Sequence, residues 1–298
     1  MTVDVEARDI WFSYLGDKNY AVRGASIIAR AGETLAIVGP TGCGKSTLLL
    51  ILAGLLKPQK GSVYYNGKLI TELLPGIRRV IGFLFQDPED QLFNPTVFDE
   101  VAYALRTMGL PEQRIRELVE SISVKLRIKH LLSRPPYKLS VGEKKRVALA
   151  SILVYDPEVL ILDEPTANLD AEGVSMLVDI VLKARKQGKT VILASHDLEF
   201  VFKVADRVYI MREGRIQEEV PGRELLRPEI LDKVNIAPPL VARVIERLGV
   251  KYEDIVELAR SEDDDQSRTT RASPIIEGEL SSPRGLGVGA SSSDTSLN

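Results

Sequence analysis

Cysteine is nearly absent from this 298-residue sequence, as are long apolar runs and any excess of basic charge. A single cysteine, Cys43, excludes an internal disulfide framework and fits a reducing compartment. The longest apolar run, TLLLILAGLL at 47–56, is too short to span a bilayer. A net charge of −3 provides no general basic field, so we expect no nucleic-acid partner. The N-terminus lacks the pattern of a signal peptide. These absences predict a cytosol-facing chain that meets membranes through partner proteins.

Short apolar runs and helical patterns alternate along the first 220 residues. ETLAIVG at 33–39, VLILDEP at 159–165 and TVILASHD at 190–197 are strand-like runs that end in polar loops. A helical pattern runs from Lys45 to about Leu56 and is stopped by Lys57-Pro58. Alternation of this kind favours a parallel sheet covered by helices.

Turn signals and composition indicate how the rest of the chain is organised. Hairpin turns are expected at Gly16-Asp17, Asn66-Gly67 and Glu213-Gly214. The segment from about 87 to 157 is helix-rich and predicts an inserted helical subdomain. We therefore expect a main domain over 1–220 and a small appendage of two or three short helices over 221–260. The tail at 261–298 has too little apolar surface to order itself.

The segment LSVGEKKRVALA at 139–150 has the pattern of a capped helix. Ser140 and Glu143 form a capping box, in which each side chain satisfies a backbone N–H at the helix start. Apolar and small residues then follow at helical spacing, at Val147, Ala148, Ser151, Ile152 and Val154. The Lys-Lys-Arg run at 144–146 is either a solvated helix face or a set of charges that balances a nearby anion.

The segment GPTGCGKST at 39–47 follows a predicted strand and opens a predicted helix. Gly39, Gly42 and Gly44 let the backbone curl so that its N–H groups converge, and the helix start adds partial positive charge. Phosphate oxygens fit there. Lys45 can reach the terminal phosphates, and the Ser46 hydroxyl can ligate Mg²⁺.

Polar residues follow three further strand-like runs. Asp163 ends VLILD and is expected to hold Mg²⁺, while Glu164 is placed to polarise the water that attacks the γ-phosphate. Gln86 follows VIGFLF and can touch both the metal and that water. His196 ends VILAS at a strand's carboxyl edge, where ligands of open α/β sheets collect. The other histidine, His130, is expected to be solvated.

Taken in order, these segments resemble the ATP-binding cassette (ABC) ATPases over about residues 3–220. GPTGCGKST is similar to their Walker A motif, LILDE to Walker B, ANLD at 167–170 to the D-loop and SHD at 195–197 to the switch histidine. Gln86 matches the Q-loop, and LSVGE at 139–143 matches the signature Leu-Ser-Gly-Gly-Gln. The resemblance implies an α/β P-loop NTPase with a RecA-like parallel-sheet core, an N-terminal antiparallel β subdomain, the helical insertion and the small C-terminal helical appendage.

The resemblance also implies ATP and Mg²⁺ as cofactors and a set of residues that bind them. The catalytic residues would be Glu164, His196 and Gln86, and the metal ligands Ser46, Gln86 and Asp163. Nucleotide contacts would come from Tyr14, Gly39, Pro40, Thr41, Gly42, Cys43, Gly44, Lys45, Ser46, Thr47, Ser140, Gly142, Glu143 and Asp170. Among these, Tyr14 would stack on adenine, and Cys43 fills a variable position without acting as a nucleophile.

In ABC ATPases two cassettes pair head to tail, and each ATP lies between one Walker A and the partner's signature helix. The resemblance therefore implies that Ser140 and the N–H of Gly142 meet the γ-phosphate held by a partner, and that hydrolysis lets the dimer open. Two residues depart from the signature. Val141 replaces a glycine, which impairs this half-site if positive φ is required there, and Glu143 replaces glutamine and adds a negative charge.

The segment QDPEDQLFNPTVFDEVAYALRTMGLP at 86–111 closely resembles the energy-coupling-factor branch of the family. Its apolar residues Leu92, Phe93, Val97 and Phe98 either pack inside the helical subdomain or line a groove that receives a short helix from a membrane subunit. APPLVARVIERLG at 237–249 is similar to the C-terminal segment that holds two such ATPases together.

This resemblance implies ATP-driven import of cobalt, nickel or a vitamin, at the cytoplasmic face of the membrane. The implied partners are a second copy or a related ATPase, a transmembrane coupling subunit and a membrane substrate-binding subunit. Two alternatives stay open. One is a soluble ABC ATPase that serves translation, DNA repair or iron–sulfur assembly, and the other is a regulatory cassette that barely hydrolyses ATP.

Overall fold

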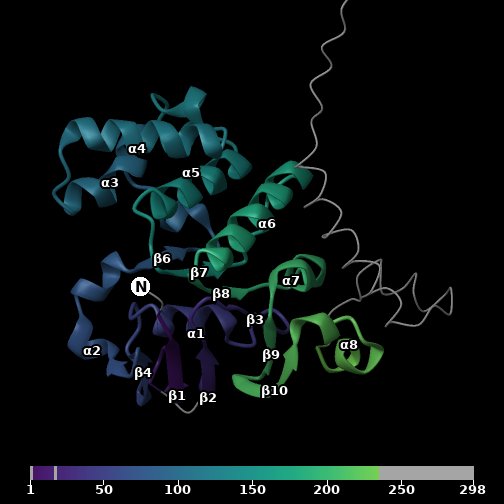
Figure 1. Ribbon diagram of the computed structural model, residues 1–298. Helices are drawn as coiled ribbons and strands as arrows, with labels where there is room; N and C mark the ends of the chain where they lie inside the picture. Colours follow the sequence, from purple (N-terminus) through teal and green to yellow (C-terminus); the bar gives the residue numbers. More distant parts are fainter. Residues whose placement is uncertain (1–2, 17–18, 235–298) are drawn as a thin grey trace, which may run out of the picture. The chain divides into compact units, whose positions relative to one another are not determined.

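The computed structural model describes residues 3–16 and 19–234 (Figure 1). The segment 237–249, the rest of the expected appendage beyond residue 234 and the tail 261–298 lie outside the described residues. None of the described helices is long and apolar enough to cross a membrane.

An antiparallel sheet has the strand order β2-β1-β4-β5. Its strands are β1 (Val5–Phe12), β2 (Val22–Ala29), β4 (Lys60–Tyr65) and β5 (Lys68–Leu69). Strands β4 and β5 pair across Asn66-Gly67, and both turn residues have positive φ, at 48° and 75°. This is the geometry that an Asn-Gly hairpin favours, so the turn predicted from the sequence is confirmed.

The second sheet has the order β10-β9-β3-β8-β7-β6. Its strands are β3 (Thr34–Val38), β6 (Ile81–Leu84), β7 (Val159–Asp163), β8 (Thr190–Ala194), β9 (Arg207–Arg212) and β10 (Arg215–Pro221). Strands β6 to β9 and β3 are parallel, while β9 and β10 form the hairpin predicted at Glu213-Gly214. Every residue of β3, β7 and β8 is buried, as expected for central parallel strands. The mixed α/β fold with its parallel core is thereby confirmed.

Helix α1 joins the two sheets into one core. Its buried leucines and Ile51 belong to the same apolar cluster as Val5 and Ile27 of the antiparallel sheet and Ile161 of the parallel sheet. The helix runs from Lys45 to Leu52, so the predicted end near Leu56 is wrong. Gly54 adopts φ +68° and ends the helix earlier, as glycine commonly does at this position.

The remaining helices connect and cover the strands (Figure 1). The α-helices are α2 (Ile70–Leu73), α3 (Val97–Thr107), α4 (Glu112–Lys125), α5 (Val141–Leu153), α6 (Ala171–Lys186), α7 (Leu198–Val204) and α8 (Pro228–Val234). The 3₁₀ turns are η1 (Gly76–Arg79), η2 (Pro88–Asp90), η3 (Lys129–Leu131), η4 (Pro136–Lys138) and η5 (Gly222–Glu224). In the sequence, helices α3, α4 and α5 follow β6 and precede β7, within the segment expected to be a helical insertion. The three helices pack on one another.

Candidate active site

The loop between β3 and α1 is shaped to hold an anion. Gly44, the last residue before α1, has φ +107°, and a Cβ there would lie 2.2 Å from the carbonyl oxygen of Ala21. Only glycine fits this position. No side chain caps the start of α1, so its N–H groups face the loop without a side-chain acceptor. Lys45 is 6% exposed, and its Nζ donates to the carbonyls of Gly39 at 2.8 Å and Pro40 at 3.2 Å.

Asp163 ends β7 beside Ser46 of α1, and its surroundings fit a divalent cation. Burial raises the pKa of Asp163, and a hydrogen bond with Ser46 partly opposes that rise. Its Oδ1 is buried and has no hydrogen-bond partner among the described residues. A buried oxygen of this kind calls for a ligand. Ser46, Gln86 and Asp163 all offer oxygen atoms, the donors that Mg²⁺ prefers. The residues present therefore fit the expected metal.

Glu164 is held in a strained and specific geometry next to Asp163. Its φ is +42°, and the residue is 7% exposed. Oε2 accepts from Nδ1 of His196 at 2.8 Å, from the His196 backbone N–H at 3.2 Å and from the Ser195 hydroxyl at 3.4 Å. Residues held in left-handed backbone conformations cluster at functional sites. Because a carboxylate can only accept, Nδ1 of His196 carries the proton in this pair.

Most of these groups line one cleft of about 360 Å³, while Asp163 is not among its lining residues. The predicted site residues that line it are Tyr14, Thr41, Gly42, Gly44, Lys45, Ser46, Thr47, Gln86, Glu164 and His196. A second cleft of about 510 Å³ shares Tyr14 and Gly42 with the first and extends to Tyr20 and Arg23. The Tyr14 ring is 63% exposed, and its hydroxyl lies 3.1 Å from Oγ1 of Thr47. The first cleft therefore contains the groups suited to phosphates, and the residues that the two clefts share include an exposed aromatic ring, that of Tyr14.

Three expected nucleotide contacts lie on the loop but not among the residues lining that cleft. Gly39 and Pro40 turn their carbonyls to Lys45. Cys43 is 6% exposed, and burial raises the pKa of its thiol, which agrees with the expectation that it is not a nucleophile.

The signature residues lie away from this cleft, at the start of α5. The predicted capping box is confirmed: Ser140 N–H donates to Oε2 of Glu143 at 2.8 Å, and Glu143 N–H donates to Oγ of Ser140 at 3.3 Å. The bonds that the backbone N–H and the hydroxyl of Ser140 donate to the carboxylate lower the pKa of Glu143. Gly142 and Val141 belong to the first turn of α5. The backbone of Val141 is helical with negative φ, so this conformation puts no strain on its branched side chain, which is 50% exposed.

The basic run that follows is not a solvated helix face. Lys145 is completely buried, which the sequence interpretation did not anticipate. Its Nζ donates to the carbonyls of Phe85 at 3.2 Å and Gln86 at 3.0 Å. Burial lowers the pKa of Lys145 to about 8. Lys144 forms an ion pair with Glu89.

Arg146 and Asp170 connect the signature helix to the D-loop segment. Arg146 donates to the two carboxylate oxygens of Asp170 at 2.9 and 3.2 Å. Asp170 also caps α6 by accepting from the N–H of Gly173 at 2.8 Å. Among the expected nucleotide contacts, Asp170 therefore lies beside the signature helix and not among the residues lining the cleft.

The four apolar residues near 92–98 differ in exposure. Val97 is completely buried, so of the two alternatives it packs inside the protein and lines no exposed groove. Leu92 and Phe98 are half-buried. Phe93 is 68% exposed and packs edge-to-face on Tyr103 of α3, with ring centroids 5.0 Å apart. The exposed apolar surface is therefore an aromatic pair, Phe93 and Tyr103.

The chain is similar to several known proteins. A family model described as ABC transporter matches residues 22–167. The energy-coupling factor transporter ATP-binding protein EcfA of Methanocaldococcus jannaschii is 39% identical over 251 residues, covering 83% of this chain and 90% of that protein. EcfA2 of Clostridium perfringens is 38% identical over 252 residues, covering 83% of this chain and 88% of that protein.

Two solved structures are similar as well. CbiO1 of Clostridium perfringens, described as part of the ABC transporter complex cbiONQ, has a TM-score of 0.68 at 36% identity and covers 83% of this chain and all of that one. A dimer of the ATP-binding cassette MJ0796 bound to ADP and Pi has a TM-score of 0.67 at 26% identity and covers 73% of this chain and 98% of that one.

Proposed function

Because the chain belongs to the ABC transporter family of ATP-binding proteins, we propose that it is the ATP-hydrolysing subunit of an energy-coupling-factor importer. The cargo that we propose is a metal ion such as cobalt or nickel, or a vitamin. The ATPase would act as a dimer with a second copy or a related ATPase, at the cytoplasmic face of the membrane. A transmembrane coupling subunit and a membrane substrate-binding subunit would complete the importer.

One observation carries the catalytic part of this proposal. Glu164, held by His196, lines the same cleft as Lys45, Ser46 and Gln86. Glu164 is placed to accept the proton of the attacking water, and His196 fixes the direction in which its carboxylate points. The N-terminus of α1 and Lys45 bind the phosphates.

The metal would be held by residues on three different elements. Ser46 comes from α1, Asp163 from the end of β7 and Gln86 from the loop after β6. When bound, Mg²⁺ neutralises charge on the terminal phosphates. The unpaired Oδ1 of Asp163 supports this role.

The signature helix supports the proposed dimer. Ser140 and Gly142 open α5 with a complete capping box and are not among the residues lining the chain's own cleft. Ser140 is exposed to solvent, so this helix start is open to the γ-phosphate of a nucleotide that a second cassette holds. MJ0796, a related cassette, is itself dimeric.

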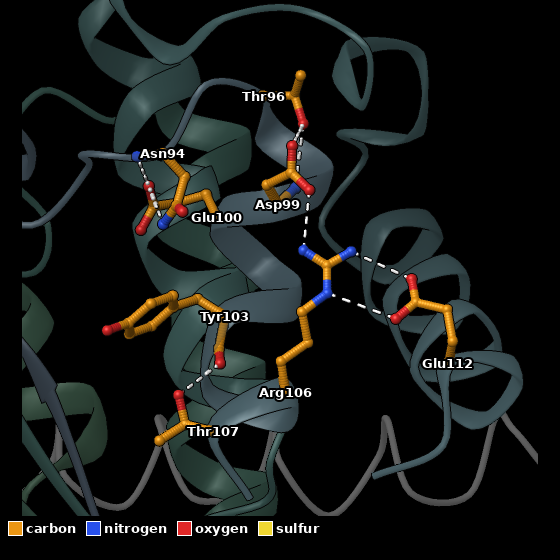
Figure 2. A network of polar contacts seen from close by, with 8 residues as sticks. All are labelled: Asn94, Thr96, Asp99, Glu100, Tyr103, Arg106, Thr107 and Glu112. Atoms are coloured by element: carbon orange, nitrogen blue, oxygen red, sulfur yellow. Dashed lines mark hydrogen bonds and ion pairs between the residues drawn. The ribbon is translucent and has the colours of Figure 1, made fainter. Parts of the chain in front are cut away.

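A docking surface for the membrane subunit is proposed at the aromatic pair Phe93 and Tyr103. Figure 2 shows how this region is held: Oε2 of Glu100 on α3 accepts from the backbone N–H and from the side-chain amide of Asn94. Glu100 is 3% exposed. The same oxygen accepts from the Phe93 N–H at 2.9 Å. Figure 2 also shows Arg106 of α3 joining Asp99 to Glu112, which ties α3 to α4. A rigid exposed aromatic pair is typical of sites that anchor a partner helix.

The proposal is tested by capture from detergent-solubilised membranes. The tagged wild-type chain is expected to retain an integral membrane protein, and Phe93→Asp is expected to lose it. Val124→Asp is the matched control, because Val124 is 57% exposed on α4 and lies outside the aromatic pair. The captured complex, placed in liposomes, should then take up Co²⁺, Ni²⁺ or a labelled vitamin only with ATP. Capture of ribosomes or DNA instead would favour a soluble ABC ATPase and overturn the importer proposal.

A further inference from the structure

Lys145 is the least exposed charged side chain in the part of the chain that the structure describes, with 0% of its surface accessible. An ammonium group removed from water is costly unless it is well bonded. Here its hydrogen-bond partners are two successive backbone carbonyls, those of Phe85 and Gln86, at 3.2 and 3.0 Å. The charges of Asp163, Glu164 and Asp87 also favour the ammonium form. Its position therefore depends on the loop that carries Gln86.

The two ends of this contact belong to different parts of the proposed dimer. Gln86 lines the nucleotide cleft of its own chain. Lys145 lies in the second turn of α5, whose first residues, after Ser140, would face the nucleotide of the second cassette. Two bonds to adjacent carbonyls fix the orientation of the peptide groups around Gln86. Since the Gln86 side chain projects from that backbone, its place in the cleft depends on the ammonium group.

We propose that Lys145 is a positioning residue for ATP hydrolysis: it fixes the Gln86 backbone and couples the chain's own nucleotide site to the signature helix that serves the opposite site. This inference rests on the roles proposed above for Gln86 and for the dimer. A shift of α5 moves the Lys145 ammonium group, and with it the donor to which the carbonyls of Phe85 and Gln86 are bonded. Gln86 therefore reaches its working position only when the signature helix is in place.

A second contact keeps α5 docked independently of Lys145. Nε2 of Gln91 donates to the carbonyl of Ala148 at 3.1 Å and to Oγ of Ser151 at 3.0 Å. Removing the ammonium group therefore leaves the helix attached to the same loop one turn further along. We expect substitution of Lys145 to alter the placement of Gln86 without releasing the helix.

The experiment is a double-mutant cycle on Mg-ATP hydrolysis by the full chain. Lys145→Met has a similar length but no N–H donors, and Lys183→Met on the exposed surface of α6 is the matched control. Lys145→Met is expected to lower kcat at least about tenfold, with the KM for ATP changed by less than about twofold, because the lost contact acts on the reacting geometry. In a Gln86→Ala background, Lys145→Met should lower kcat no further.

Two results would overturn the inference. One is a Lys145→Met kcat within about twofold of wild type, and the other is a full tenfold fall that persists in the Gln86→Ala background. A Gln86→Ala enzyme with wild-type kcat would overturn it too, since Lys145 is argued to act through Gln86. Should Lys145→Met not fold, Lys145→Gln, which keeps N–H donors on a shorter chain, enters the same cycle with a smaller expected fall. This cycle measures ATP hydrolysis and not uptake. A failure of the importer assignment would therefore appear only in the liposome uptake experiment.

Discussion

Replacement of Glu100 by alanine is the sharpest structural perturbation of the proposed docking surface. Oε2 of Glu100 accepts from three N–H groups, on Phe93 and Asn94, at 2.8 to 3.2 Å. Each hydrogen bond to a charged group contributes about 1.5–3 kcal/mol, and bonds that share one acceptor do not add fully. The freed loop can bind water because Phe93 is exposed. We therefore expect Glu100→Ala to lower the free energy of unfolding by about 3 kcal/mol.

That loss corresponds to a fall in Tm of about 6–12 °C for a domain of this size. Urea unfolding followed by circular dichroism measures the free energy directly. Glu117→Ala is the matched control, since Glu117 forms only an exposed ion pair with Arg114 and should cost less than about 1 kcal/mol. Glu100→Gln keeps one neutral acceptor and should fall between the two. A Glu100→Ala loss no larger than that of Glu117→Ala would show that the three hydrogen bonds to Glu100 do not stabilise this loop. The variant should also capture the membrane partner less well than Glu117→Ala does.

Two further predictions concern pH and the signature. The Tyr65 hydroxyl donates to the Leu52 carbonyl at 2.8 Å, and burial raises the pKa of Tyr65, so Tyr65→Phe should cost about 1 kcal/mol at pH 8. Above about pH 10 the tyrosine ionises in the unfolded wild type but not in the folded one, and this destabilises the wild type alone. The difference in unfolding free energy between the wild type and Tyr65→Phe should therefore narrow as pH rises. A difference that stays constant or widens would contradict the prediction. Val141→Gly relieves no backbone strain because φ at Val141 is already negative. The substitution should lower the free energy of unfolding by up to about 1 kcal/mol and leave kcat for ATP hydrolysis within about threefold. A tenfold gain in kcat would show instead that the branched side chain impairs the half-site.

Features encoded by neighbouring residues were predictable from the sequence. The turn at Asn66-Gly67 requires positive φ at both positions, which this pair tolerates, and the hairpin forms there. The capping box of Ser140 and Glu143 is encoded within four residues and is present in full. The parallel core followed from apolar runs that end in polar loops, and the three strands that those runs predicted are buried throughout.

Features that depend on residues far apart in the chain were missed. Lys145 lies three and seven residues before Ala148 and Ile152, so helical spacing already placed it on the buried face of α5. What makes burial tolerable is a pair of carbonyls about 60 residues earlier, at Phe85 and Gln86. The residues around Lys145 in the sequence do not indicate that these acceptors lie beside it in the fold. Of the two interpretations of the basic run, a solvated face or a set of balancing charges, the solvated face is therefore wrong for Lys145.

The position of the helix end shows a simpler failure. Pro58 is an obvious stop signal, but α1 ends at Leu52, four residues before the predicted limit at Leu56. The chain leaves the helical conformation at Gly54, whose φ is positive. From the sequence alone, a glycine inside an apolar run is interpreted as part of the helix, because its φ is not known. Here the positive φ of Gly54 decides the boundary.

The central claim is that ATP joins two cassettes across Lys45 of one and Ser140 of the other, and that Glu164 ends this state by promoting hydrolysis. It is tested most directly by the mass of Glu164→Gln in saturating Mg-ATP, measured by light scattering, alone or mixed with the ATPase that co-purifies with it. We expect a dimer, of twice the 32.9 kDa monomer mass for two copies of this chain, which is absent in Mg-ADP and abolished by adding Lys45→Ala. A Glu164→Gln protein that stays monomeric in Mg-ATP, even with its membrane partner present, would contradict it.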